Sequence, residues 1–148
     1  MNETTDATRR GITLSAEETD RLYRISARVN AGVSVEEILD AVFEEFRPIL
    51  PYDRMEYTNV DRGGLRLTTT WVRTTYEPVI LGVGHVVETE RPIKETLSPG
   101  SPPFLENDVP RYAGERPDGH PGHKLLAEGI RAVMSCPMFV ADAAIGML

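Results

Sequence analysis

The sequence has a single cysteine and no long apolar run, and both absences exclude classes of protein. Cys136 alone cannot form an internal disulfide framework, and its isolation is consistent with a reducing compartment. The longest nearly uncharged stretch, residues 133–148, is interrupted by Pro137 and Asp142 and is shorter than the roughly 20 apolar residues that cross a bilayer. Residues 1–14 lack the apolar core of a secretory signal. We therefore expect a cytoplasmic protein without a membrane-spanning segment.

Basic residues are scarce as well. The 16 Lys and Arg residues are outnumbered by 23 Asp and Glu residues, which leaves a formal net charge of −7, and they are scattered along the chain. Binding to a phosphate backbone requires clustered Lys and Arg, so we expect no direct contact with nucleic acid. The length of 148 residues and the apolar content of 41% are typical of one globular domain.

Two capping boxes predict helices in the first third of the chain. In "SAEE" and "SVEE", Ser15 and Ser34 are each followed three residues later by a glutamate that can bond back to the serine amide. Apolar residues at helical spacing follow both motifs. We expect helices over about 15–30 and from Ser34 to the turn at Pro48, preceded by a flexible leader at 1–14.

A change of periodicity then predicts a β-hairpin. The segments 54–60 and 65–73 are rich in β-branched and aromatic residues and are separated by the turn sequence "DRGG". Alternate residues of a strand point to one face. The residues expected on the core face of the second strand are Leu65, Leu67, Thr69 and Trp71.

The middle of the chain, residues 78–121, is rich in proline and glycine and predicts a loop-rich lid. Within it we expect strand residues at 79–87, a short helix at 92–97 and a short strand at 104–106. "HKLLAEG" then predicts a helix, and "RAVMSCPMFV" and "AAIGML" predict two strands. This order favours an α+β fold, with a central antiparallel sheet, helices packed on one face and the lid on the other.

The last 24 residues, "LLAEGIRAVMSCPMFVADAAIGML", resemble the end of a GAF domain, a regulatory module of signalling proteins. The segment "SVEEILDAVFEEFRPILPYDRMEYTNVD" is similar to the leading helix and first strand of that family, and "ENDVP" matches the Asp ahead of its lid. The resemblance covers 15–148 and implies a small-molecule pocket between the sheet and the loops of 82–125. GAF domains usually continue into a long C-terminal helix, so we expect a chain truncated before that helix and an effector domain.

The polar residues expected to face this pocket flank the lid and the adjoining strand: Asp108, Arg111, Tyr112 and Arg131. Arg131 could bind an anionic ligand group bidentately. A salt bridge from Arg131 to Asp108 or Glu128 is an equally good interpretation.

The histidines and the cysteine permit chemical roles, but simpler roles are favoured. His85 could be an axial haem ligand, as in some relatives, although a strand-end histidine bonded to a backbone carbonyl is the simpler interpretation. His120 and His123 lie near Asp118 in a loop interrupted by Gly and Pro, which favours polar caps over a metal site. Cys136 precedes a proline on a predicted strand and is interpreted as a packed apolar side chain, which argues against a covalently attached bilin.

These observations together predict a non-catalytic, small-molecule-sensing domain of a larger bacterial-type signalling protein, such as a sensor kinase, cyclase or transcriptional regulator. The ligand and any cofactor are not identified by the sequence. An enzyme is disfavoured because no nucleophile with a matching base can be assembled. We expect a homodimer, and the alternative function is a ligand-free dimerisation module in which helix 15–30 packs on its copy through Leu22, Ile25 and Val29.

Overall fold

The computed structural model describes residues 13–93 and 97–148, which form two compact units. One unit ends at Pro51, and the other extends over Tyr52–Leu148. All but the last two residues of the predicted leader, 1–14, lie outside the described residues.

The first unit contains two helices, α1 (Ala16–Asn30) and α2 (Val35–Phe46). Both predicted capping boxes are present: the Ser15 hydroxyl accepts from the Glu18 amide, and the Glu18 carboxylate accepts from the Ser15 amide at 2.7 Å. The equivalent pair of bonds begins α2. Capping therefore sets both helix starts where the sequence predicts them.

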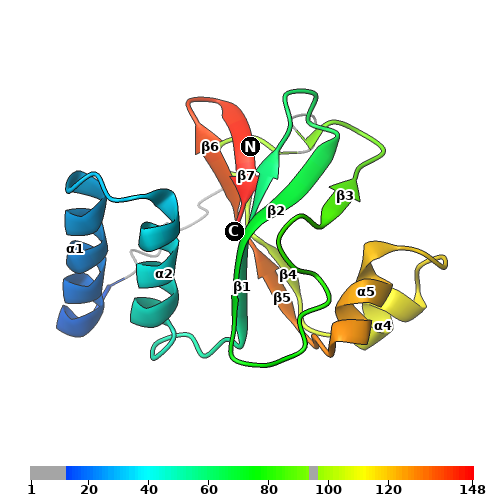
Figure 1. Cartoon of the computed structure of the whole chain (residues 1–148), viewed down its shortest axis with the longest axis horizontal. Helices are drawn as coiled ribbons and strands as arrows, with labels where there is room; N and C mark the ends of the chain where they lie inside the picture. Colours follow the sequence, from blue (N-terminus) through cyan, green and yellow to red (C-terminus); the bar gives the residue numbers. More distant parts are fainter. Residues whose placement is uncertain (1–12, 94–96) are drawn as a thin grey trace, which may run out of the picture. The chain divides into compact units, whose positions relative to one another are not determined.

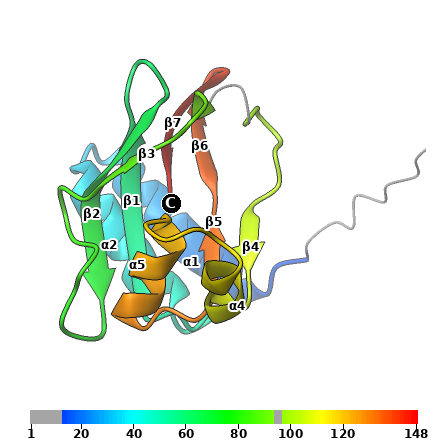
Figure 2. The same ribbon diagram turned by 90° about the vertical axis from the view of Figure 1, so that its right-hand side faces the viewer.

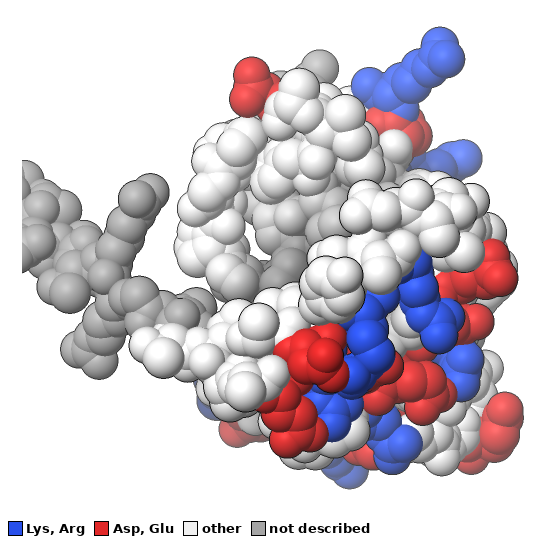
Figure 3. Space-filling model, turned by 90° about the vertical axis from the view of Figure 1, so that its left-hand side faces the viewer, with Lys and Arg blue, Asp and Glu red and all other residues white. Residues whose placement is uncertain are grey.

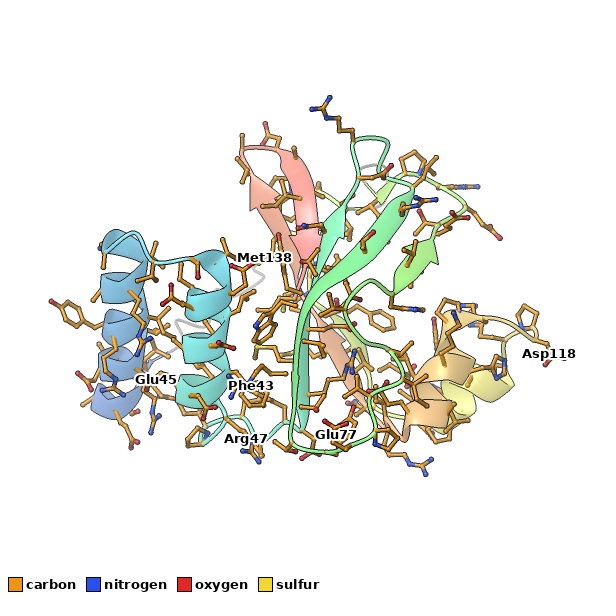
Figure 4. All side chains as sticks on the ribbon, viewed as in Figure 1. Phe43, Glu45, Arg47, Glu77, Asp118 and Met138 are labelled. Atoms are coloured by element: carbon orange, nitrogen blue, oxygen red, sulfur yellow. The ribbon has the colours of Figure 1, made fainter. Side chains whose placement is uncertain are left out.

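One glutamate of α2, Glu45, joins the two helices. Its carboxylate accepts from Arg24 at 2.7 and 3.1 Å, and its carbonyl accepts from Arg21 at 2.8 Å. Glu45 lies between α1 and α2 in Figure 4, and the hydrogen bond from Arg24 holds its pKa below the usual range. Acidic and basic side chains are interspersed on the face that carries α1 (Figure 3), so paired charge covers this helix pair.

The second unit is built on an antiparallel sheet of five strands in the order β3-β2-β1-β7-β6 (Figure 1). This confirms the predicted α+β class. The bounds of its strands are Arg54–Val60 (β1), Arg66–Thr74 (β2), Val86–Glu88 (β3), Pro137–Val140 (β6) and Ala143–Met147 (β7).

A two-stranded sheet of β4 (Phe104–Glu106) and β5 (Val133–Ser135) continues this sheet. Only Cys136 separates β5 from β6, and Cys136 and Leu148 exchange two backbone hydrogen bonds, at 2.7 and 2.9 Å. The segment from β5 to β6 is therefore one strand, paired with β4 over its first half and with β7 over its second.

Two helices, α4 (Val109–Gly114) and α5 (Pro121–Glu128), lie over one face of this sheet (Figure 2). The predicted helix end is confirmed, because Gly129 has the left-handed conformation, with φ of 91°. Helix α4 was not predicted. Its six residues are too few to show helical periodicity, and its start is capped by Asp108.

The prediction that Thr69 and Trp71 share one face of strand β2 is wrong. A β-bulge shifts the register so that Tyr57 pairs with Trp71 while the next residue, Thr58, pairs with Thr69. Successive residues of β1 point to opposite faces, so Thr69 and Trp71 do as well. Both are buried, whereas Leu65 precedes the strand and is exposed.

The segment before β3 is also more irregular than predicted. The strand expected at 79–87 is limited to Val86–Glu88, because Gly84 adopts a φ of 86° that a regular strand does not allow. The strand predicted at 104–106 is confirmed as β4. Of the short helix predicted at 92–97, residues 94–96 lie outside the described part of the chain.

The close approach of β7 to β1 requires glycine at position 146. A Cβ atom added there would lie 2.4 Å from the Thr58 carbonyl oxygen and 2.7 Å from the Tyr57 ring. Backbone cannot move aside as a flexible side chain can, so we predict that Gly146→Ala lowers the free energy of unfolding by about 2 kcal/mol or more. Urea unfolding followed by circular dichroism measures this loss.

Gly82→Ala is the matched control, since an added Cβ at that position meets no atom within 4 Å. It should change the free energy of unfolding by less than about 0.5 kcal/mol. Equal losses for the two variants would contradict the tight β1 to β7 contact.

Candidate functional site

One face of the sheet in the second unit carries the candidate site, and we call it the lid face. Residues paired across antiparallel strands share a face, so Thr58, Met147 and Pro137 lie on the same side. Arg54 precedes Thr58 by four residues on β1 and shares this side, where it binds Glu128 of α5. The lid face is therefore the one over which α4 and α5 lie.

A buried carboxylate holds α5 on the lid face. The Glu128 side chain is fully buried and accepts hydrogen bonds from the Arg54 guanidinium at 2.6 Å and the Tyr76 hydroxyl at 2.7 Å. It also accepts from the amides of Ile80 and Leu81, at 2.9 and 2.6 Å. We call these five residues the Glu128 anchor. It joins the end of α5 to the start of β1 and to the segment after β2.

The Glu128 carboxylate and the Arg54 guanidinium stay ionised because each is hydrogen-bonded or paired with an opposite charge. Burial raises the pKa of Glu128, but the hydrogen bonds from Tyr76 and Leu81 and the charge of Arg54 outweigh it, so the pKa is lowered. Burial and the hydrogen bond to Glu128 raise the pKa of Tyr76 to about 12. Arg54 also pairs with Glu56 at 2.5 Å and donates to the Leu81 carbonyl. Glu128 is therefore ionised and Tyr76 neutral near pH 7.

The β4–β5 pairing stops early because of proline. Cys136 directs its amide toward Leu148 of the β7 side, so the nitrogen of the next residue, Pro137, faces β4. Proline has no N–H to donate, and Pro102 and Pro103 precede β4 on the opposing chain. The ladder ends at the Phe104–Ser135 pair, and the segment before β4 leaves the sheet edge.

A groove of about 350 Å³ lies where this segment departs. Its floor is formed by Ser135, Pro137 and Met147 of the lid face, and its wall by Leu97 and residues 101–104. Figure 2 shows the wall segment passing down beside β6 to reach β4. The volume falls within the roughly 300–1,000 Å³ of small-molecule sites. This apolar groove, which we call the proline groove, matches the position predicted for the pocket.

Aromatic side chains connect the groove to the helices above it. The Phe104 ring, which lines the groove, packs edge to face on Tyr112 at a centroid distance of 6.2 Å. Tyr112 in turn packs on His120 at 5.5 Å, and the Arg116 guanidinium lies 4.9 Å from its ring centre. A change at Phe104 would therefore act on α4 and on the start of α5.

Four of the five sequence-predicted site residues gather around α4. Asp108 caps the helix by accepting from the Arg111 amide at 3.0 Å, and Arg111 pairs with Glu115 at 3.0 Å. Tyr112 supports the groove wall through Phe104. The carbonyl of the exposed Arg131 accepts from the amide of α4's first residue at 2.9 Å. None of the four lines the proline groove.

The fifth residue, His85, lies in the turn before β3, at the opposite edge of the sheet from β4. Its carbonyl accepts from the Thr69 amide at 2.9 Å. Ligand contact by Asp108, Arg111, Tyr112, Arg131 and His85 stays a prediction. Of the five, Tyr112 has a direct packing route to the groove. The alternative salt bridge from Arg131 to Glu128 is not formed, because Arg54 occupies that carboxylate.

The remaining histidines serve the local structure. His120 caps α5, with its Nδ1 accepting from the Gly122 amide at 3.1 Å, and Nε2 of His123 lies 3.3 Å from the Arg116 carbonyl. Asp118 lies at the tip of the loop between α4 and α5 (Figure 4). Among residues 13–93 and 97–148, no three His, Cys, Asp or Glu side chains are grouped to hold a metal. Likewise, no helix in these ranges is long and apolar enough to cross a bilayer.

The Glu128 anchor could not be predicted from the sequence. Arg54 and Tyr76 lie 74 and 52 residues from Glu128 in the chain, so no local motif links them. Pro102 and Pro103 fell within the predicted loop-rich lid and Pro137 within a predicted strand, and no sequence pattern showed that these prolines line one groove.

Solved GAF domains share this architecture. A phycocyanobilin-bound GAF domain from a cyanobacterial phytochrome matches with a TM-score of 0.66 and 21% sequence identity, over 92% of this chain and 79% of that chain. A phycoerythrobilin-bound GAF domain from a cyanobacterial phytochrome matches with a TM-score of 0.65 and 18% identity, over 90% and 80%.

The GAF domain of Acinetobacter phosphoenolpyruvate-protein phosphotransferase matches with a TM-score of 0.59 and 14% identity, over 90% of this chain and 76% of that chain. No protein-family model and no curated protein matches the sequence. The chain therefore has the GAF fold, which confirms the predicted resemblance at the level of the fold.

The anchor predicts a large effect of neutralising Glu128. Glu128→Gln removes the charge opposite Arg54 and leaves a buried guanidinium with only partial compensation, so the free energy of unfolding should fall by about 3 kcal/mol. Glu115→Gln is the control, because Glu115 forms an exposed i,i+4 pair with Arg111 and should cost less than about 0.5 kcal/mol. Similar losses in the two variants would contradict the anchor.

The loss of free energy of unfolding in Glu128→Gln should depend on pH. The folded-state pKa of Glu128 is lowered, so its contribution is complete above the unfolded value of about 4.3 and is lost as the pH falls further, through the folded value. The gap in free energy of unfolding between wild type and Glu128→Gln should therefore narrow below about pH 4. A gap that stays constant into this acid range would assign the effect to packing instead.

Proposed function

We propose that this chain is a non-catalytic sensing domain of a larger cytoplasmic signalling protein, and that its small-molecule ligand occupies the proline groove. The observation that carries the proposal is the groove itself, which lies on the lid face, is lined mainly by apolar side chains and touches the packing of α4. The GAF fold supports it, because GAF domains of solved structure hold bilins.

The contacts around the groove suggest how binding would be transmitted. A ligand against Phe104 would act on Tyr112, and through it on His120 at the start of α5. The far end of α5 is held by Glu128, whose partner Arg54 begins β1. Binding would favour one position of α4 and α5, and such a population shift is how a ligand controls a signalling domain.

Native mass spectrometry of the full chain, freshly purified from cells, tests this function. We expect a non-covalent small-molecule adduct on the wild-type chain. Ser135→Leu places a larger side chain on the groove floor and should abolish the adduct, whereas Ser26→Leu, the same change at an exposed position of α1, should retain it. A wild-type chain without adduct, or an adduct kept by Ser135→Leu, would contradict the proposal.

A ligand-free dimerisation module is the second candidate function, and the surface of α1 favours it. Leu22 and Val29 of this helix are 39% and 51% exposed, although both occur at apolar positions of the helical repeat. A second copy could cover them. This function predicts a dimer without adduct in the same spectra, and a monomer for Leu22→Glu, with Thr19→Glu on the same helix as the exposed control.

A further inference from the structure

We propose that the proline groove selects an uncharged, largely apolar ligand and rejects anions, an inference that rests on the ligand-sensing function proposed above. It specifies the chemistry of the ligand, which the fold does not determine. It depends on three properties of the groove: the charges near it, the hydrogen-bond donors it offers and its size.

The charges near the groove disfavour an anion. None of the eight described residues that line it carries a charge. The next residue after Phe104 on the same face of β4 is Glu106, an acidic residue whose side chain is only 14% exposed. Arg111 approaches Glu106 at 3.8 Å but pairs with Glu115 at 3.0 Å. The charge of Arg111 is thus already matched by carboxylates.

The groove also offers few hydrogen-bond donors. Its three prolines have no N–H. The Leu97 amide donates to the Ile93 carbonyl at 2.8 Å, and the Ser101 amide donates to Ser98 at 2.9 Å. Ser101 Oγ accepts from the Ser98 amide, so the side-chain donors left among the lining residues are the hydroxyl protons of Ser101 and Ser135.

Two hydroxyl groups cannot replace the water around a carboxylate, phosphate or sulfonate, so an anion that entered the groove would lose more solvation than it regains. An apolar molecule loses little on leaving water and gains contact with Phe104, Met147 and Leu97. One hydroxyl or carbonyl on the ligand could be met by Ser135. The volume of about 350 Å³ is at the lower end for ligand sites and suits a compact molecule.

A matched pair of fluorescent probes tests this chemistry on the full chain. N-phenyl-1-naphthylamine is neutral, and anilinonaphthalene sulfonate has the same ring systems with one added sulfonate. We expect the neutral probe to bind at least about tenfold more tightly in fluorescence titrations. Ser135→Leu should weaken the neutral probe by about tenfold, because it fills the groove floor.

Adding a positive charge to the groove should reverse part of the selectivity. Pro102 lines the groove and is exposed, so Pro102→Arg should leave the fold intact, which circular dichroism checks. It should tighten the sulfonate probe about fivefold, in line with a single exposed charge pair. Pro99→Arg is the control, an exposed proline of the same segment outside the groove lining, and it should change neither dissociation constant.

The outcomes separate the ligand chemistry from the proposed function. If the sulfonate probe binds wild type as tightly as the neutral probe, while Ser135→Leu and Pro102→Arg still alter binding, the groove is a ligand site and the inference about charge is wrong. If neither variant alters either probe, the groove binds neither, and both the inference and the ligand-sensing function at this site are overturned.

Discussion

A single buried carboxylate determines how the helices meet the sheet in the larger unit. Burial removes water from the Glu128 carboxylate, and only hydrogen-bond donors can compensate for that loss. The donors are the Arg54 guanidinium, the Tyr76 hydroxyl and the amides of Ile80 and Leu81. Any shift of α5 would separate this carboxylate from several partners at once. The end of α5 is therefore fixed to β1, whereas its start is held by the His120 cap and by the packing of Tyr112 on His120.

The two parts of the lid face consequently differ in chemistry. Near Arg54 the lid face is polar, and its charged groups are hydrogen-bonded. Near Pro137 it is apolar, and the β4–β5 ladder ends. The interruption follows from the backbone, because a proline nitrogen faces β4 where an amide would have continued the ladder. A ligand in the proline groove would contact Phe104, which reaches the start of α5 through Tyr112, while the Glu128 anchor holds the other end of α5. Such a helix would turn about its anchored end rather than slide.

Local chemistry made most of the fold predictable. Capping boxes at Ser15 and Ser34, the "DRGG" turn and the left-handed Gly129 each act over a few residues, so their patterns are visible in the sequence. The bulge beside Thr69 depends on how β1 and β2 pair, and the Glu128 anchor depends on partners 52 and 74 residues away, so no local spacing reveals either. The sequence predicted a pocket between the sheet and the loops of 82–125, and the proline groove lies between these parts, although none of the predicted polar residues lines it. Asp108 and Arg111, which were expected to face a ligand, form structural contacts at α4 in the described structure, and their contact with a ligand stays a prediction.

Likeness to bilin-bound domains shows the fold of this chain and does not identify a ligand for it. Cys136 illustrates the point. Its neighbours Ser135 and Pro137 both line the groove, and successive strand residues point to opposite faces, so the Cys136 side chain is directed away from the lid face. A molecule in the proline groove therefore cannot be held by a thioether to this cysteine. Retention there would depend on non-covalent burial against proline, phenylalanine and methionine, and such a surface would favour the molecule of suitable size that loses the least hydration.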